Sequence, residues 1–360
     1  MIVTEPMQAA LWEEWCSSGK IHCFLCAHHC RIGPGERGLC GVRENREGAL
    51  YTLVYGCPIS TAADPIEKKP LFHFLPGTSS YSIATVGCNF RCSFCQNADI
   101  SQMPRGGGRV AGGVMPPEQV VSAARRAGCR SISFTYTEPT IFYEYARDCA
   151  RLATSQGLKN ILVTNGYMTR QMLADLDGDL HAANVDLKSF SDEFYRTMTG
   201  ARLQPVLDSI RRLHEMGVWL EVTTLLIPGY NDSADELRAL ARFLVSVSPD
   251  IPWHVSRFSP CYRLLDVPPT SRSSLEEAWR IGHDMGLHYV YLGNIPGSGF
   301  ESTVCPGCGE VVIERRGFAI RADRLKDGTC PHCRRCIAGM SDGEVLIARS
   351  SQGRKKYDPT

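Results

Sequence analysis

The sequence predicts an α/β fold for residues 78–300, with a parallel sheet that is wound as a barrel or a partial barrel. From Tyr81 onward, strand-like and helix-like stretches alternate, which is typical of repeated β-then-α units. Prolines stand at several of the expected helix starts and glycines directly after several helix ends, as helix capping favours. In such folds the chemistry gathers at the C-terminal ends of the strands. The residues that end each strand are therefore the first candidates for a functional site.

The individual elements follow from the apolar periodicity between turn residues. Strands are expected at 80–86, 131–136, 160–165, 182–188, 218–227, 253–258 and 288–293. Helices are expected at 117–127, 139–155, 170–176, 205–215, 234–247 and 273–285. Before this core, a short amphipathic helix is expected at 7–19, and residues 64–70 are expected to form an extended connector, because prolines stand at both of its ends or next to them.

The composition is that of a globular protein with a substantial core. Among its 360 residues, 43% are hydrophobic and 21% are charged, and the net charge of +1 attracts neither nucleic acid nor a membrane surface. No apolar run reaches the roughly 18 residues of a spanning helix, and the N-terminus lacks the pattern of a signal peptide. The 17 cysteines are odd in number and mostly clustered at metal-ligand spacing. We therefore expect a cytoplasmic protein with metal sites rather than disulfides.

The most informative cysteines lie in the segment CNFRCSFCQN, directly after the first strand of the expected barrel. Cys88, Cys92 and Cys95 have the spacing C-x3-C-x2-C. A 4Fe–4S cluster normally binds four thiolates, so a loop with three leaves one iron open. The amino and carboxylate groups of S-adenosylmethionine (SAM) suit an open iron, and the cluster electron can then cleave SAM to a 5′-deoxyadenosyl radical. A zinc knuckle is the alternative, although zinc sites usually pair two C-x2-C hooks.

A second cysteine group lies near the N-terminus. Cys23, Cys26, Cys30 and Cys40 are spaced C-x2-C-x3-C-x9-C, among glycines that allow tight turns. Four soft ligands within a short segment can close a metal site. Three interpretations remain open, namely a zinc knuckle, an auxiliary iron–sulfur cluster and unrelated buried cysteines.

A third group lies in the C-terminal tail. Cys305 with Cys308, and Cys330 with Cys333, form two C-x2-C hooks on either side of a strand-like run. This arrangement favours a closed tetrahedral zinc site, with a rubredoxin-like iron or a further cluster as alternatives. Cys336 is surplus to that set and is interpreted as a spare ligand, a reactive thiol or a buried residue.

These groups divide the chain into four expected parts. They are a cysteine-rich segment at 1–77, the barrel at 78–300, a zinc-ribbon-like or auxiliary metal domain at 301–345 and a disordered tail at 346–360.

The motifs CNFRCSFCQN, TYTEPT, VTNG, VDLK and LLIPGYND together resemble the activating-enzyme branch of the radical SAM superfamily, which includes the enzymes that activate pyruvate formate-lyase. With DPIEKKPL before the loop and the head and tail cysteines, the pattern over nearly the whole chain is similar to the radical SAM member of the AmmeMemoRadiSam system. This resemblance implies a partial (β/α)6 TIM-like barrel with the catalytic cluster after its first strand.

The resemblance also implies roles for individual residues. Cys88, Cys92 and Cys95 would bind the 4Fe–4S cluster. The following residues would contact SAM: Phe94, Glu138, Asn165, Lys188, Asn294 and Ile295. Glu138 stands where relatives carry Gly-Gly-Glu for the methionyl amino group, but Tyr136 and Thr137 replace the glycines here. His254 would lie near the substrate.

Two of these roles compete with simpler structural ones. Lys188 suits the carboxylate of SAM through a charge-assisted hydrogen bond, yet Asp186 and Lys188 also share one strand face and can pair with each other. His254 is equally well explained as a core histidine with satisfied hydrogen bonds.

The leading hypothesis is therefore a radical SAM oxidoreductase. Its substrate would be a protein glycyl residue or another macromolecule, with a small molecule as the alternative, including sulfur insertion from an auxiliary metal–sulfur site. The implied partners are an electron donor such as flavodoxin or ferredoxin, together with Memo-like and AmmeCR-like proteins. The contrary hypothesis is an adaptor in which all three cysteine groups hold zinc without catalysis.

Overall fold

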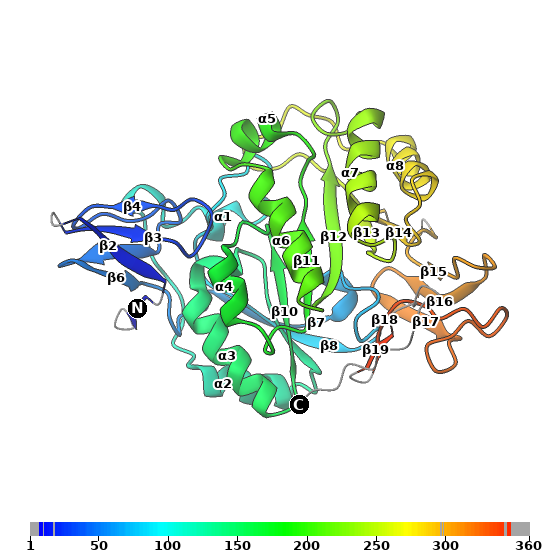
Figure 1. Ribbon diagram of the computed structural model, residues 1–360, viewed down its shortest axis with the longest axis horizontal. Coiled ribbons are helices and arrows are strands. Elements are labelled where there is room, and N and C mark those ends of the chain that lie inside the picture. Colours follow the sequence, from blue (N-terminus) through cyan, green and yellow to red (C-terminus); the bar gives the residue numbers. More distant parts are fainter. Residues whose placement is uncertain are drawn as a thin grey trace.

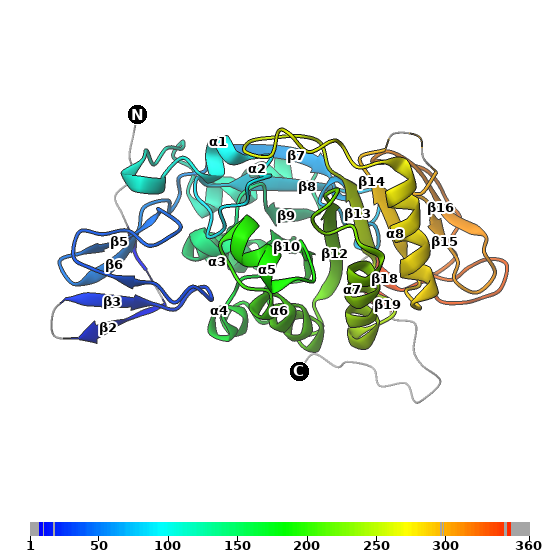
Figure 2. The same ribbon diagram turned by 90° about the horizontal axis from the view of Figure 1, so that it is seen from above.

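The computed structural model describes residues 7–9, 11–16, 19–295, 297, 299–341 and 344–346. Its centre is an eight-stranded sheet in the order β14-β13-β12-β11-β10-β9-β8-β7. The cysteine-rich head lies on one side of this barrel-like body and the tail ribbon on the opposite side (Figures 1 and 2). Within the described part of the chain, no helix is long and apolar enough to cross a membrane.

The central sheet confirms the expected fold class. Its strands are β7 (Ser60–Pro65), β8 (Ser79–Ala84), β9 (Ser131–Phe134), β10 (Lys159–Thr164), β11 (Ala182–Asp186), β12 (Trp219–Leu226), β13 (Trp253–Arg257) and β14 (Val290–Gly293). Neighbouring strands from β8 to β14 are parallel, and β7 alone joins antiparallel to β8. Because parallel strands end at the same edge, the loops after β8 to β14 share one face of the sheet.

Helices follow the strands as β-then-α units require. They are α1 (Ala98–Ser101), α2 (Pro117–Arg126), α3 (Tyr143–Ser155), α4 (Arg170–Asp175), α5 (Asp192–Phe194), α6 (Gln204–Glu215), α7 (Ala234–Val247) and α8 (Arg272–Asp284). Three segments are 3₁₀-helical, namely η1 (Ile66–Lys68), η2 (Arg105–Gly107) and η3 (Pro139–Phe142), and η4 (Tyr195–Thr199) is π-helical. One or more helices follow each strand from β8 to β13, which gives the six units of a (β/α)6 barrel. Figure 2 shows them around the outside of the sheet.

The head is built from short antiparallel strands. They are β1 (Met7–Gln8), β2 (Trp12–Cys16), β3 (Lys20–Cys23), β4 (Arg31–Ile32), β5 (Arg43–Arg46) and β6 (Ala49–Thr52), arranged as sheets β2-β3-β4 and β1-β6-β5. The expected helix at 7–19 is therefore wrong. That segment pairs with β3 and β6 instead, and such long-range pairing overrides a short apolar spacing pattern.

A buried ion pair joins the head to the barrel. The guanidinium of Arg43 on β5 donates from Nη1 and Nη2 to the two carboxylate oxygens of Glu144 on α3, at 2.8 and 2.9 Å. Both side chains are almost completely shielded from solvent. The head backbone also docks on the loop after β10, where Ala27 N donates to Tyr167 O at 3.2 Å. The head cysteines are thereby held close to the C-terminal edge of the sheet.

The tail forms a three-stranded ribbon and a small hairpin. The ribbon contains β15 (Thr303–Val304), β16 (Val311–Arg316) and β17 (Ala319–Asp323), and the hairpin contains β18 (Gly339–Ser341) and β19 (Glu344–Leu346). Apolar side chains of the tail, among them Val312 and Ile337, pack in a separate core. The same core contains Phe72 and Phe74 from the segment that follows β7, together with Tyr289. Residues 347–360, expected to be disordered, lie outside the described residues.

Two features refine the expected division of the chain. The segment 64–70 is not an extended connector, because it contains the end of β7 and the turn η1. β7 belongs to the central sheet although its residues fall within the range 1–77.

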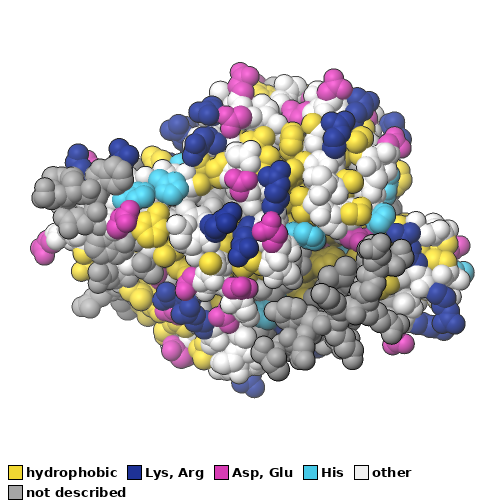
Figure 3. Space-filling model, viewed as in Figure 1, with side chains coloured by type: hydrophobic (Ala, Val, Ile, Leu, Met, Phe, Trp, Pro, Cys, Tyr) yellow, Lys and Arg dark blue, Asp and Glu magenta, His cyan; other side chains and the backbone are white. Residues whose placement is uncertain are grey.

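On the face shown in Figure 3, basic and acidic side chains are interspersed, in line with the net charge of +1.

Candidate functional site

A cavity of about 310 Å³ opens at the C-terminal edge of the central sheet. Its walls come from the cysteine loop after β8, from the ends of β9, β10 and β11, and from the segment after β7. This is the place where parallel α/β folds carry their chemistry.

The cysteine loop forms one wall of this cavity. Cys88, Cys92 and Cys95 all line it. Arg105 fixes the loop, because its Nη2 donates to the carbonyl oxygens of Cys88 and Phe90 at 3.0 and 2.7 Å. Burial raises the pKa of the Cys92 thiol to about 12, although Lys188 acts against this shift. Thiolates in such a position need a strong cationic partner, and a metal centre provides one.

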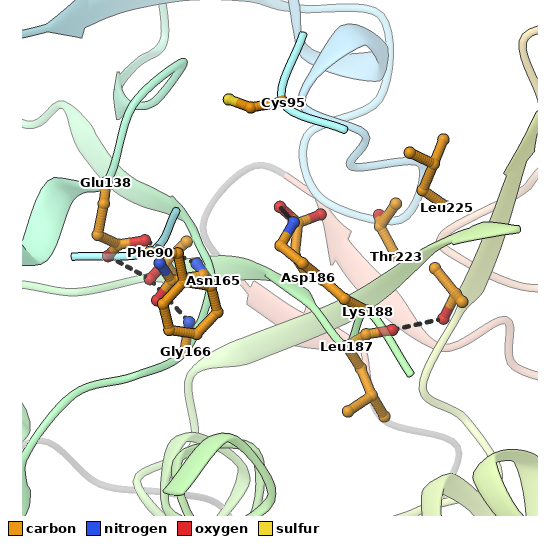
Figure 4. Close-up of polar contacts among 12 residues, drawn as sticks. Phe90, Cys95, Glu138, Asn165, Gly166, Asp186, Leu187, Lys188, Thr223 and Leu225 are labelled. Carbon is orange, nitrogen blue, oxygen red and sulfur yellow. Dashed lines mark hydrogen bonds and ion pairs between the residues drawn. The ribbon is translucent and has the colours of Figure 1, made fainter. Parts of the chain in front are cut away.

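Glu138 and Asn165 form the wall beside this loop (Figure 4). The Glu138 carboxylate is buried and accepts hydrogen bonds from Asn165 N and Thr164 Oγ1, both at 2.7 Å, and from the backbone and hydroxyl of Thr140. Burial raises the pKa of Glu138, and these hydrogen bonds oppose the rise. Since a carboxylate has about four acceptor positions, most of its capacity is already used within the protein.

Asp186 and Lys188 lie at the end of β11 and both line the cavity. Lys188 Nζ is 3.0 Å from Asp186 Oδ2, so the ion pair that the sequence offered as the structural alternative is present. Burial lowers the pKa of Lys188, but Asp186 and Cys92 raise it more, so the ammonium stays charged. Lys188 Nζ also lies 5.9 Å from the centre of the Phe94 ring, which places a cation and an aromatic face together in the cavity.

The cavity has a further polar wall, whose residues were not predicted from the sequence as part of the site. Lys68, Lys69 and Tyr136 line it, and all three donate to the carboxylate of Asp64. Tyr136 has a positive φ of 62°, which is uncommon for a tyrosine. The signal available in the sequence was the run Asp64 to Lys69, which combines four charged residues in a segment expected to be a connector.

The remaining predicted residues divide into two groups. Phe94 and Asn294 line the cavity, whereas Ile295 packs at the edge of the main core and is not among the lining residues. His254 does not reach the cavity either. It is buried on β13, and its Nε2 is 2.6 Å from Glu221 Oε2. This position matches the alternative expected from the sequence, a core histidine with satisfied hydrogen bonds.

The tail cysteines form a compact candidate metal centre. The ligand atoms of Cys305, Cys308, Cys330 and Cys333 all lie within 4.8 Å of one another. The Sγ atoms of Cys305 and Cys333 are 3.5 Å apart, and those of Cys308 and Cys330 are 3.6 Å apart. Zn–S bonds of about 2.3 Å in a tetrahedron require sulfur–sulfur distances of about 3.8 Å, so these residues fit one zinc ion. Cys336 does not belong to this set.

The head cysteines surround a separate small cavity. Cys23, Cys26, Cys30 and Cys40 all line it, together with Asn89, the residue after Cys88. The structure therefore brings together each of the three cysteine groups that the spacing indicated.

Comparisons with known proteins give a consistent result. The family model of the radical SAM superfamily matches residues 82–244. An uncharacterized protein of Methanocaldococcus jannaschii is 44% identical over 331 residues, which cover 92% of this chain and 98% of that protein. Pyruvate formate-lyase 1-activating enzyme of Escherichia coli (strain K12) is 23% identical over 159 residues, which cover 44% of this chain and 65% of the enzyme.

A solved structure that also matches is that of a radical SAM methyltransferase from Sphaerobacter thermophilus. It aligns with a TM-score of 0.48 and 18% identity, over 61% of this chain and 67% of that one.

Proposed function

The chain belongs to the radical SAM superfamily, and from this membership we propose that Cys88, Cys92 and Cys95 hold a 4Fe–4S cluster at the wall of a SAM-binding cavity. Membership implies an enzyme that uses the cluster, SAM and radical chemistry. With both groups bound, one electron from the cluster splits the sulfonium bond of SAM and releases a 5′-deoxyadenosyl radical that abstracts hydrogen from the substrate.

The observation that carries this proposal is the composition of one cavity. Three thiols line it, which leaves one iron of a four-iron cluster without a protein ligand. Charged and polar groups for an amino acid moiety line the same cavity, as does the Phe94 ring. The donor set thus fits both the cluster and SAM.

The residues of the cavity suggest distinct tasks. The Lys188 ammonium is suited to the carboxylate of SAM, and its pairing with Asp186 keeps it charged and oriented. Phe94 and Asn294 are suited to the adenine, by ring contact and by hydrogen bonding. We assign Glu138 a positioning task, because its oxygens hold Asn165 and Thr164 in place. Ile295 is not among the residues that line the cavity, so no contact with SAM is assigned to it.

The substrate remains a matter of proposal. Similarity to an activating enzyme favours a glycyl residue of a protein or another macromolecule, and a Memo-like or AmmeCR-like protein would then act as a partner. The electron would come from flavodoxin or ferredoxin. Radical conversion of a small molecule, including sulfur insertion from an auxiliary site, is the second candidate, favoured by the two further cysteine groups.

Anaerobic spectroscopy tests the proposal. The wild-type protein is expected to be brown and to show an electron paramagnetic resonance (EPR) spectrum, after reduction, that changes when SAM is added. Cys88→Ala should remove the SAM-dependent change, whereas Cys149→Ala, at a buried cysteine of α3 outside the three groups, should keep it. A colourless protein that holds only zinc would support the adaptor hypothesis and contradict the enzyme.

Deuterated candidate substrates then identify the class of substrate. Deuterium transfer into 5′-deoxyadenosine from a peptide with labelled glycine would support the macromolecular substrate. Transfer from a labelled small molecule alone would support the second candidate.

A further inference from the structure

The head cysteines lie around a site that is separate from the cysteine loop after β8. Cys23, Cys26, Cys30 and Cys40 all line one small cavity. Four of the eight other residues that line it are apolar: Leu25, Ile32, Leu39 and Ile141. The four thiols of the head therefore converge on one cavity with an apolar side.

The sulfur atoms of the head cysteines lie farther apart from one another than those of the tail site. Among the described residues, only the tail set has three or more ligand atoms all within 4.8 Å of one another. No three of the four head thiols are as close as the ligands of one zinc ion require. The same is true of Cys88, Cys92 and Cys95. In a cubane cluster each thiolate binds a different iron, so the ligands stand farther apart than those of a single ion.

Two buried donors without partners line the same cavity. Arg43 Nε and Asn89 Nδ2 are both buried, and neither has a hydrogen-bond acceptor among the described residues. The orientation of the Asn89 amide is fixed, because its Oδ1 accepts from Asn165 Nδ2 at 2.7 Å. Orphaned buried donors are costly unless a bound group accepts from them. The sulfur atoms of an anionic cluster would accept from both.

The head cavity also lies directly beside the SAM cavity. Asn89 lines the head cavity, and the adjacent Cys88 lines the SAM cavity. His28, which also lines the head cavity, is bonded through Nε2 to the carbonyl oxygen of Asn89 at 2.9 Å. Two adjacent residues of the chain, Cys88 and Asn89, therefore line the two cavities.

We propose that Cys23, Cys26, Cys30 and Cys40 hold a second 4Fe–4S cluster and that this cluster passes electrons to the cluster of the Cys88 loop. The transfer moves one electron at a time, so the head cluster is oxidised by one electron as the loop cluster is reduced by one. A one-electron donor such as reduced flavodoxin restores the head cluster. The relay rests on the proposed function of the loop, whereas the presence of the head cluster does not.

Metal analysis of reconstituted full-length protein tests the head cluster independently of the loop. The triple variant Cys88→Ala/Cys92→Ala/Cys95→Ala should keep about four iron and four sulfide per chain in the head. Adding Cys26→Ala and Cys30→Ala to it should remove them, whereas adding Cys149→Ala should not. A triple variant that holds no cluster iron, or that holds a second zinc ion in addition to the tail zinc, would overturn the proposal.

Reduction kinetics test the relay. After mixing with reduced flavodoxin, the wild-type loop cluster should be reduced in a fast phase, followed by its SAM-dependent EPR signal. Cys26→Ala/Cys30→Ala should lose that fast phase while its loop cluster still binds SAM, as seen by EPR after reduction with dithionite. An unchanged fast phase would overturn the relay. If this variant fails to fold, Asn89→Ala provides the second measurement, because it keeps the four thiols of the head and the three of the loop. An unchanged rate of the fast phase in Asn89→Ala would also overturn the relay.

Discussion

Asn165, which follows the last residue of β10, donates a hydrogen bond from Nδ2 to Asn89 Oδ1 in the cysteine loop at 2.7 Å. Its backbone N donates to Glu138 Oε2 at the same distance. The loop after β8 and the ends of β9 and β10 are therefore connected by buried hydrogen bonds. A substitution at Asn89, Glu138 or Asn165 is therefore expected to alter the position of the cysteine loop.

Glu138→Gln tests whether this residue holds the cavity wall together. The amide would present N–H groups to a set of protein donors, which leaves buried donors unpaired at a cost of about 1–3 kcal/mol each. We expect a loss of about 2 kcal/mol or more in unfolding free energy, together with weaker SAM binding, measured by anaerobic denaturation and calorimetry. Glu193→Gln, at an exposed residue, should change neither quantity. Unchanged stability of Glu138→Gln would argue that its carboxylate is free to bind SAM instead.

Glu144→Gln tests the ion pair between the head and α3. Removing one partner of a buried pair leaves a desolvated charge, so we expect a loss of about 3–5 kcal/mol in unfolding free energy. The double variant Arg43→Met/Glu144→Leu leaves no buried charge and should recover part of this loss. Denaturant titration measures both, and a single-variant loss below about 1 kcal/mol, the level of an exposed pair, would show that the pair is solvated.

Cys308→Ser tests the tail site. Four thiolates hold a structural zinc ion, so loss of one ligand should release about one zinc per chain. Cys336→Ser is the matched control, because Cys336 lies outside the four-sulfur set although it is close in sequence. Elemental analysis would contradict the assignment if both variants kept zinc, or if the wild-type tail held iron.

Acid should destabilise the contact between the barrel and the tail through His73. Burial lowers the pKa of His73 to about 4 from its ordinary value of 6.5. His73 Nδ1 lies 2.6 Å from Ala338 O and donates to it, so Nε2 accepts from Tyr291 Oη at 2.5 Å. The unfolded chain takes up a proton near pH 6.5 and the folded chain only near pH 4, so stability is full above this window and falls as the pH drops through it.

The size of this effect follows from the separation of the two pKa values. At about 1.4 kcal/mol per pH unit, the loss between pH 6.5 and 4 approaches about 3 kcal/mol. His73→Gln should flatten the pH dependence of the unfolding free energy by a similar amount. Equal slopes for the wild-type and the variant would mean that His73 is not neutral in the folded protein.

The barrel could be predicted from sequence because its signals are local. Apolar periodicity and end residues located α7 at Ala234–Val247 and placed Cys88, Glu138, Asn165 and Lys188 at strand ends. The short strands β1 and β2 could not be predicted in this way, because their partners β6 and β3 decide their conformation. The lysines after β7 were missed for the same reason, since antiparallel pairing of β7 with β8 brings them to the cavity.

His254 shows a different limit. The side chain of a histidine on a barrel strand can point into the cavity or away from it into the core. Which of the two it does depends on the side chains that are available to contact it. Here Glu221 on β12 accepts from it at 2.6 Å, and Tyr291 stacks on its ring. Neither contact is visible in the sequence, because both partners are far away along the chain.

Reductive cleavage of SAM is the most direct test of the central claim. Anaerobic protein incubated with dithionite and SAM should form 5′-deoxyadenosine and methionine, quantified by chromatography and mass spectrometry. Cys92→Ala should form none, whereas Cys149→Ala should retain the activity. Product formation that survives Cys92→Ala, or its absence from the iron-loaded wild-type protein, would contradict the account.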